Sequence, residues 1–247
     1  MNRTLYRSIA AAAFACSFCL LIPSASASVM GDLKIDGGTV TVGIAGLTWS
    51  STPTPPTVDG ISTLTYGPTN TLLTGGTVVN LMNLPPGSLP LDAFMTFVGV
   101  PTVDFILDTI GPGSGNTDCS VGGLAANSGD CSVVTGEPIV LSQQATGTLA
   151  SLAVTGTVTD GTSPASSWIG LFSETIVSLP NTTGIITPLE VQQYFGGPSN
   201  PNGNTLGESY SGSFAITVTP EPSTLTMMLV GSGLVLAALR TRRKSTR

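Results

Sequence analysis

The chain has 247 residues, of which only 9% are charged, and it contains no histidine. Between residues 28 and 219 a single cation, Lys34, stands against thirteen carboxylates, which gives this region a formal charge of −12. Such a region would be repelled by nucleic-acid phosphates and by anionic lipid, so the composition disfavours both as partners. The lack of histidine excludes hydrolases with a Ser-His-Asp or Cys-His arrangement and zinc sites with histidine ligands. We therefore expect a protein that is not an enzyme.

Residues 1–27 have the pattern of a secretory signal peptide. A basic start precedes an apolar run over 9–22, which is too short to cross a bilayer core of roughly 30 Å as a helix. Ala25 and Ala27 supply the small residues that a signal peptidase site needs. The alternative is a signal anchor that is never cut.

Residues 28–219 have the length of one domain and carry apolar residues at strand period. Tyr210, Phe214, Ile216 and Val218 alternate with small polar residues, and 152–158 and 168–176 alternate in the same way. Short strands separated by turn signals favour an all-β fold, and we predict an antiparallel β-sandwich with one short helix. Further strands are predicted over 38–44, 61–66, 77–82, 93–100, 103–110 and 138–144, with a loop or extended excursion over 52–57.

The one predicted helix follows Thr187, which can cap it. Pro188 suits the first helical position, and Glu190 completes a Thr-x-x-Glu capping box. Gly196 can end the helix after about two turns.

Cys119 and Cys131 remain after the signal peptide, and in an oxidising compartment an even pair predicts a disulfide. Each cysteine follows an aspartate, Asp118 or Asp130. A disulfide would bring these carboxylates near each other, where a cation would relieve their repulsion. Calcium is a candidate because it takes carboxylate and carbonyl oxygens. The alternative is that the two side chains splay into water, and no other cofactor or metal is expected.

Two further side-chain groups have a functional and a structural interpretation. Asp104 and Asp108 share a strand face, but four residues at about 3.3 Å each place them roughly 13 Å apart. Glycosidase carboxylates lie about 5 to 9.5 Å apart, so we interpret these two as solvated acids. Trp168 could stack on a sugar, but its alternation with Phe172 and Ile176 favours a place in the core.

The C-terminal segment, 220–247, begins with Pro220, Glu221 and Pro222. Two prolines in three residues exclude a helix through the motif. An apolar stretch over 225–239 follows, and a basic cluster after it would stay in the cytoplasm and leave the upstream domain outside. The cluster comprises Arg240, Arg242, Arg243 and Lys244. An ordinary membrane anchor on a proline-rich stalk is the alternative.

This order of Pro-Glu-Pro, apolar helix and basic end resembles the PEP-CTERM sorting signal, and the β-rich region loosely resembles the ectodomains found before such signals. The resemblance implies transient anchoring in the inner membrane of a Gram-negative bacterium and processing by an exosortase-type membrane protease. It implies delivery to the cell surface or extracellular matrix, in association with exopolysaccharide or biofilm. We expect a structural or adhesive role. The alternative is a lectin-like carbohydrate-binding module, assisted by calcium.

Overall fold

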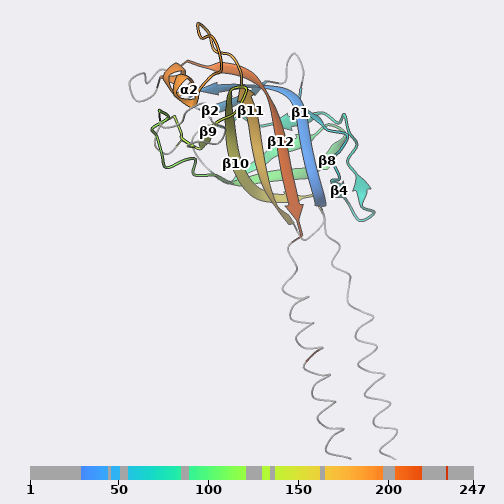
Figure 1. Ribbon diagram of the computed structural model, residues 1–247. Coiled ribbons are helices and arrows are strands. Elements are labelled where there is room, and N and C mark those ends of the chain that lie inside the picture. The colour runs from blue at the N-terminus through green and yellow to red at the C-terminus, as the bar shows by residue number, and fades with distance from the viewer. Residues whose placement is uncertain are drawn as a thin grey trace, which may run out of the picture. The chain divides into compact units, whose positions relative to one another are not determined.

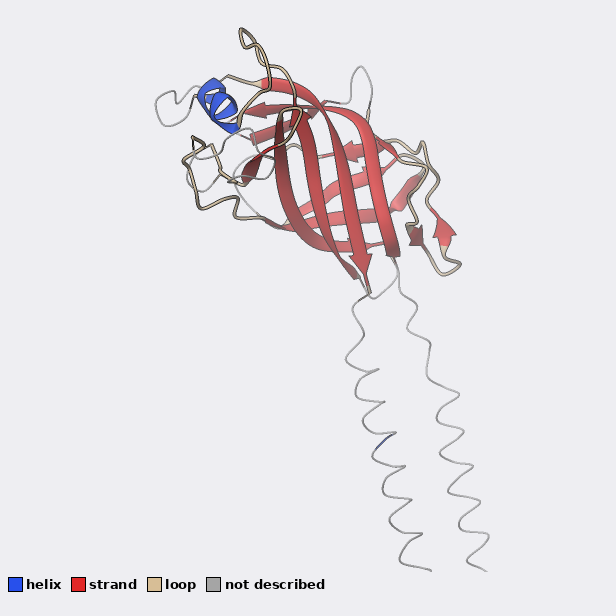
Figure 2. Ribbon diagram, in the orientation of Figure 1, coloured by secondary structure: helices blue, strands red, loops and turns tan. Residues whose placement is uncertain are grey.

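The protein is described by a computed structural model over residues 29–43, 46–50, 55–84, 89–120, 130–133, 137–161, 165–196, 204–218 and 232. Residues Ala27–Thr219 form one compact unit. Its described part consists of antiparallel strands and one short helix, α2 (Pro188–Phe195), as Figures 1 and 2 show. The strands are β1 (Val29–Gly43), β2 (Gly46–Ser50), β3 (Thr57–Val58), β4 (Thr65–Tyr66), β5 (Thr71–Leu72), β6 (Val79–Leu81), β7 (Leu91–Phe97), β8 (Val100–Ile110), β9 (Ile139–Gln143), β10 (Thr148–Thr159), β11 (Ser166–Ile176) and β12 (Leu206–Thr217). The predicted antiparallel all-β class with one short helix is confirmed.

The strands belong to one curled sheet, whereas the predicted sandwich needs two separate sheets. The order is β5-β4-β1-β12-β11-β10-β8-β7-β6, with β2 and β3 also paired to β1 and β9 to β10. The curl brings β6 back to β3, where Val58 N donates to Thr77 O and Val79 N to Pro56 O, each at 2.9 Å. Period-two alternation reports one buried face per strand, and it is the same for two packed sheets and for one sheet closed on itself.

Small residues on the inner face make room for the large rings that fill the curled sheet. A Cβ atom on Gly156 would lie 2.7 Å from the Trp168 ring, and one on Gly170 would lie 2.3 Å from the Phe214 ring. The same pairing recurs at Gly38, under the ring of Tyr210. Large residues facing small ones are the way a narrow, strongly curved sheet fills its interior.

The predicted inner faces of the last strands are confirmed. Tyr210, Phe214 and Ile216 of β12 are buried, and so are the apolar inward positions of β10 and β11. Val218 is the exception at 40% exposure, because β12 ends at Thr217.

Helix α2 has the predicted caps. Thr187 accepts a hydrogen bond from the backbone nitrogen of Glu190, and the Glu190 side chain accepts one from the backbone nitrogen of Thr187. Gly196 ends the helix in the left-handed conformation, with φ of 97°, which a residue without a side chain adopts at no steric cost.

Several predicted boundaries were wrong. The predicted strand 38–44 is the second half of β1, which continues through a register shift between Ile35 and Gly38. The predicted strands 93–100 and 103–110 leave a gap that contains Pro101, but β8 includes Pro101, and the turn lies at Val98 and Gly99. Within the predicted strand 61–66 the structure has only the two-residue strand β4.

The domain has two distinct ends, since β1 and β12 are antiparallel neighbours. Gly31 pairs with Ile216 at the end where the domain's chain enters and leaves, and Val42 pairs with Leu206 at the other. Helix α2 lies at this second end (Figure 1). Within the described residues, none of the helices combines the length and the apolar character needed to cross a membrane. Apart from residue 232, the predicted membrane helix, 225–239, lies outside them.

Candidate functional site

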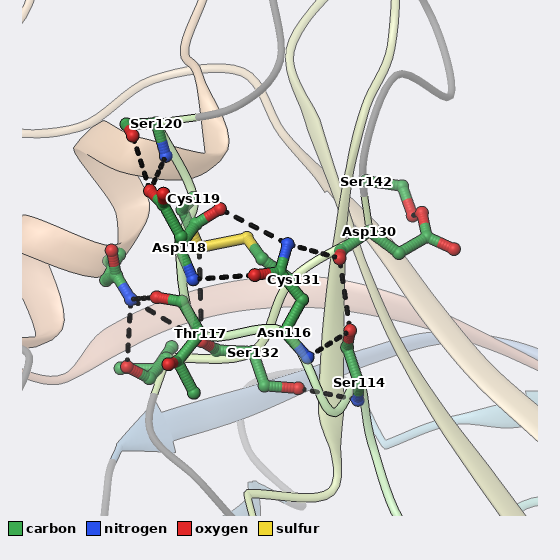
Figure 3. The surroundings of a disulfide bond; sticks show 12 residues. Ser114, Asn116, Thr117, Asp118, Cys119, Ser120, Asp130, Cys131, Ser132 and Ser142 are labelled. Atoms are coloured by element: carbon green, nitrogen blue, oxygen red, sulfur yellow. Dashed lines mark hydrogen bonds between the residues drawn. A yellow bond between two sulfur atoms is a disulfide. The ribbon is translucent and has the colours of Figure 1, made fainter.

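The predicted disulfide between Cys119 and Cys131 is present (Figure 3). Their Cα atoms are 5.4 Å apart, and both residues are buried. Cys131 also exchanges two backbone hydrogen bonds with Leu141 of β9, at 3.0 and 2.7 Å. The disulfide therefore fastens the segment after β8 to the segment that leads into β9.

Amide side chains join the two sides of this disulfide loop. Asn116 donates from Nδ2 to one backbone carbonyl on each side, at 3.3 Å in both cases. Gln192 of α2 donates from Nε2 to the carbonyl oxygens of Thr117, at 2.7 Å, and Val133, at 3.0 Å. Because these amide donors bond carbonyls of both segments, the described residues beside the disulfide and helix α2 form one hydrogen-bonded cap at the second end of the domain.

The carboxylates of Asp118 and Asp130 have different partners (Figure 3). Ser120 donates to Asp118 from its hydroxyl and from its backbone nitrogen, and these bonds hold the pKa of the Asp118 carboxyl below its usual value. The Ser142 hydroxyl donates to Asp130. In the described part of the chain no three His, Cys, Asp or Glu side chains are grouped so that they could hold a metal ion. The calcium site stays a sequence prediction, tested by calcium titration with thermal melting.

The acids of β8 lie along one strand. Asp104 pairs with Thr96 of β7 and with Thr159 of β10. Burial raises the pKa of Asp104, and the charge of Asp92 raises it further. Asp108 is four residues farther along β8, at a register shift of the β8–β10 pairing, and a regular strand of that length spans roughly 13 Å. This exceeds the spacing of a glycosidase pair.

Trp168 lies in the core, as its alternation predicts. It is 1% exposed, and its Nε1 donates to the carbonyl oxygen of Thr157 at 2.9 Å. Its ring packs against Phe105 and Phe214, with centroids 5.6 and 5.7 Å away. It is therefore no platform for a sugar.

Two adjoining cavities lie on the inner face of the sheet, toward the end that α2 covers. They share the lining residues Val42, Ile139, Ala150 and Glu174. The helix-side cavity, about 30 Å³ in volume, is completed by Val133, Glu137, Leu141, Ile176, Phe195 and neighbouring residues. The tryptophan-side cavity, about 50 Å³, is completed by Trp49, Phe172, Tyr210 and neighbouring residues.

Sequence reasoning missed these cavities, although one signal for them is present. The inward positions of β11 read Trp168, Gly170, Phe172, Glu174 and Ile176, so a carboxylate interrupts an otherwise apolar series. Across the sheet the small Ala150 pairs with Glu174. An acid opposite a small residue on a buried face departs from the local pattern, and such departures concentrate at functional sites.

The other cavity acid, Glu137, was also missed. Burial raises the pKa of its carboxyl. It comes just before β9, after the segment that the disulfide holds, so no strand alternation marks it in the sequence.

The remaining predicted site residues lie outside the described part of the chain. They are the signal peptidase residues Ala25 and Ala27, the motif Pro220, Glu221 and Pro222, and the basic cluster Arg240, Arg242, Arg243 and Lys244.

Comparison with known proteins bears on this tail. A family model described as the PEP-CTERM protein-sorting motif matches residues 218–244. Neither the curated proteins nor the solved structures include a significant match to the chain. The tail therefore identifies an exported protein that transits the membrane and is processed by an exosortase.

Proposed function

We propose that this exported protein, which carries the PEP-CTERM sorting motif, is a non-enzymatic structural or adhesive component of the cell surface or extracellular matrix. The observation that carries the proposal is the sorting motif at 218–244, attached directly to a compact, disulfide-bonded β domain. Exosortase processing would free that domain from the membrane, and its association with exopolysaccharide or biofilm would follow its release.

The chemistry of the domain supports a structural role. Between residues 28 and 219 there is neither histidine nor arginine. The sequence of the domain therefore lacks the usual general base at neutral pH, and it lacks the guanidinium group that binds carboxylates and phosphates through two hydrogen bonds. Threonine and serine dominate the outward positions of β10, β11 and β12. A neutral, hydroxyl-rich face of this kind suits repeated weak contacts with hydrated polymer.

Release is tested by replacing both motif prolines, Pro220→Ala with Pro222→Ala, in the native host. We expect the unaltered protein in the matrix with an intact mass that lacks both chain ends, and the variant in the membrane fraction with its tail retained. Pro198→Ala with Pro201→Ala is the matched control, since it changes two prolines of the same domain outside the motif. Equal release of all three proteins would contradict exosortase processing through this motif.

The structural role is tested separately, in a strain that lacks the gene. We expect weaker surface attachment and unchanged chain length of the exopolysaccharide. Purified protein incubated with that polymer should leave its molar mass unchanged. Shortening of the polymer by the purified protein would show catalysis and overturn the proposal. Tight retention on the polymer that free sugar displaces would instead establish the lectin-like alternative.

A further inference from the structure

Two large aliphatic side chains are exposed on the outer face of β11. Ile169 is 67% exposed and Leu171 is 44% exposed. Both point outward, since Trp168 and Phe172 are buried on the inner face and successive side chains of a strand alternate. Their direct neighbours on the adjoining strands are small and leave them uncovered: Ala153 and Thr155 on β10, and Ser213 and Ala215 on β12. Burying this aliphatic pair against a partner would therefore be favourable.

The two cross-strand rows that contain this pair also contain opposite charges. The row of Ile169 continues across β12 to Asp32 of β1, and the row of Leu171 continues across β12 to Lys34. Strands β10, β11, β12 and β1 lie side by side (Figure 1), and both charged side chains are exposed. One row thus ends in a carboxylate and the next row ends in an ammonium group.

This pattern is complementary to itself. Consider a two-fold axis that lies in the plane of contact, runs across the strands and passes between the two rows. It places Ile169 of one copy opposite Leu171 of the other, and Asp32 of one copy opposite Lys34 of the other. Each of these contacts then occurs twice, as a two-fold interface requires. Two β-sheets pack face to face in this manner at a separation of about 10 Å.

The charge of the domain limits where a second copy can bind. Between residues 28 and 219 the formal charge is −12, and Lys34 is the one cation in that region. Two copies that meet through carboxylates repel each other. Contact through the rows of Ile169 and Leu171 instead brings the one cation of each copy to a carboxylate of the other, so repulsion is smallest there.

The size of this face predicts weak association. Four strands about 4.8 Å apart, over about five residues at about 3.3 Å each, give an area of roughly 300 Å². A standard interface buries about 800 Å² on each partner. The outer face of the curled sheet is also convex, which limits close contact to its central strands. We therefore expect a dissociation constant on the order of 100 µM.

We propose that the outer face of β10, β11, β12 and β1 binds a second copy of this chain in a weak two-fold dimer. Ile169 packs against Leu171 of the second copy, and Asp32 pairs with Lys34 of the second copy. This association requires neither polymer nor membrane, so it goes beyond the structural role proposed above.

The test is sedimentation equilibrium of the full chain in a neutral maltoside detergent, over about 5 to 500 µM. We expect the protein mass to rise from one copy toward two as the concentration increases. Ile169→Asp should remove this rise, because it places a carboxylate at the centre of the aliphatic contact. Val98→Asp is the matched control, since Val98 is 57% exposed in the turn between β7 and β8, outside this face. No rise in the unaltered protein, or an equal rise in Ile169→Asp, would overturn the proposal.

A charge exchange tests the two-fold arrangement. Asp32→Lys alone and Lys34→Asp alone should each weaken association, because like charges would then face each other. An equimolar mixture of these two single variants should associate more strongly than either one by itself. The double variant, Asp32→Lys with Lys34→Asp, should associate like the unaltered protein, since unlike charges face each other again. A mixture no stronger than its components, or stronger association of Asp32→Lys alone, would show that net charge governs association and would refute the assigned contacts.

Discussion

Removing the disulfide between Cys119 and Cys131 tests how much this bond contributes to the stability of the cap at the second end of the domain. The perturbation is the pair Cys119→Ala and Cys131→Ala, which leaves small apolar groups at two buried positions. The bonded residues are 12 apart in sequence. For a loop of that length the chain-entropy relation predicts a loss of about 3 kcal/mol, because the unfolded chain regains the freedom that the bond removes. In a domain of this size that loss lowers the melting temperature by about 6–12 °C.

The measurement is differential scanning calorimetry of the full chain in its oxidised form, compared with the double variant. Treatment of the unaltered protein with a reductant should reproduce the shift. Cys16→Ala with Cys19→Ala is the matched control, since both residues lie in the predicted signal peptide and should leave the melting temperature unchanged. A shift below about 2 °C would refute the reasoning. It would show that the hydrogen bonds of Asn116 and Gln192 close the loop without the covalent bond.

Three further substitutions test the packing and the charge inside the domain. Gly156→Ala should lower the free energy of unfolding, measured by chemical denaturation, by about 1–3 kcal/mol, because its methyl group would lie 1.9 Å from the carbonyl oxygen of Ile106. Gly207→Ala is the control: its methyl group meets no atom within 4 Å, so the free energy of unfolding should change by less than about 0.5 kcal/mol. Gln192→Ala should lower the free energy of unfolding by about 1–3 kcal/mol in the same assay, because the carbonyl oxygens of Thr117 and Val133 lose their donor. An unchanged denaturation midpoint would show that water replaces the Gln192 amide. Glu137→Gln should raise the melting temperature at pH 7: the raised pKa means that the folded state holds the proton more tightly, so stability falls as pH rises from the ordinary value of 4.5 through the folded value. That gain should disappear below about pH 4, and a gain that is independent of pH would refute the electrostatic explanation.

Local signals in the sequence predicted the elements that are determined locally. The capping box of Thr187 and Glu190 specifies a helix start through contacts within four residues, and the structure has that helix start. The alternation in β10, β11 and β12 specifies an inner face, and the large residues predicted there are buried. The disulfide followed from cysteine parity and compartment, which depend on composition and not on distance.

Long-range features were not predictable in the same way. Whether twelve strands form two sheets or one depends on backbone bonds such as that between Val58 and Thr77, whose partners carry no matching sequence signal. The second half of β1 was predicted, over 38–44, and the first half was not; the two halves meet at Asp36, Gly37 and Gly38. In the structure these residues form an irregularity inside a continuous strand, with φ of 80° at Gly37. Bulges and turns use the same residue types, and only tertiary pairing separates them.

The closed sheet also determines how this domain can associate once it is released. A β domain with few charged side chains would aggregate through open strand edges. In the described part of the sheet the long strands β1, β8, β10, β11 and β12 have neighbours on both sides, and the outermost strand of the path beside β1 is β5, two residues long. Contacts with other molecules would then use outward side chains, which on β10 to β12 are mainly Ser and Thr hydroxyls together with the exposed Ile169 and Leu171. Because a contact through hydroxyls is weak, stable association through this face would need many such contacts at once.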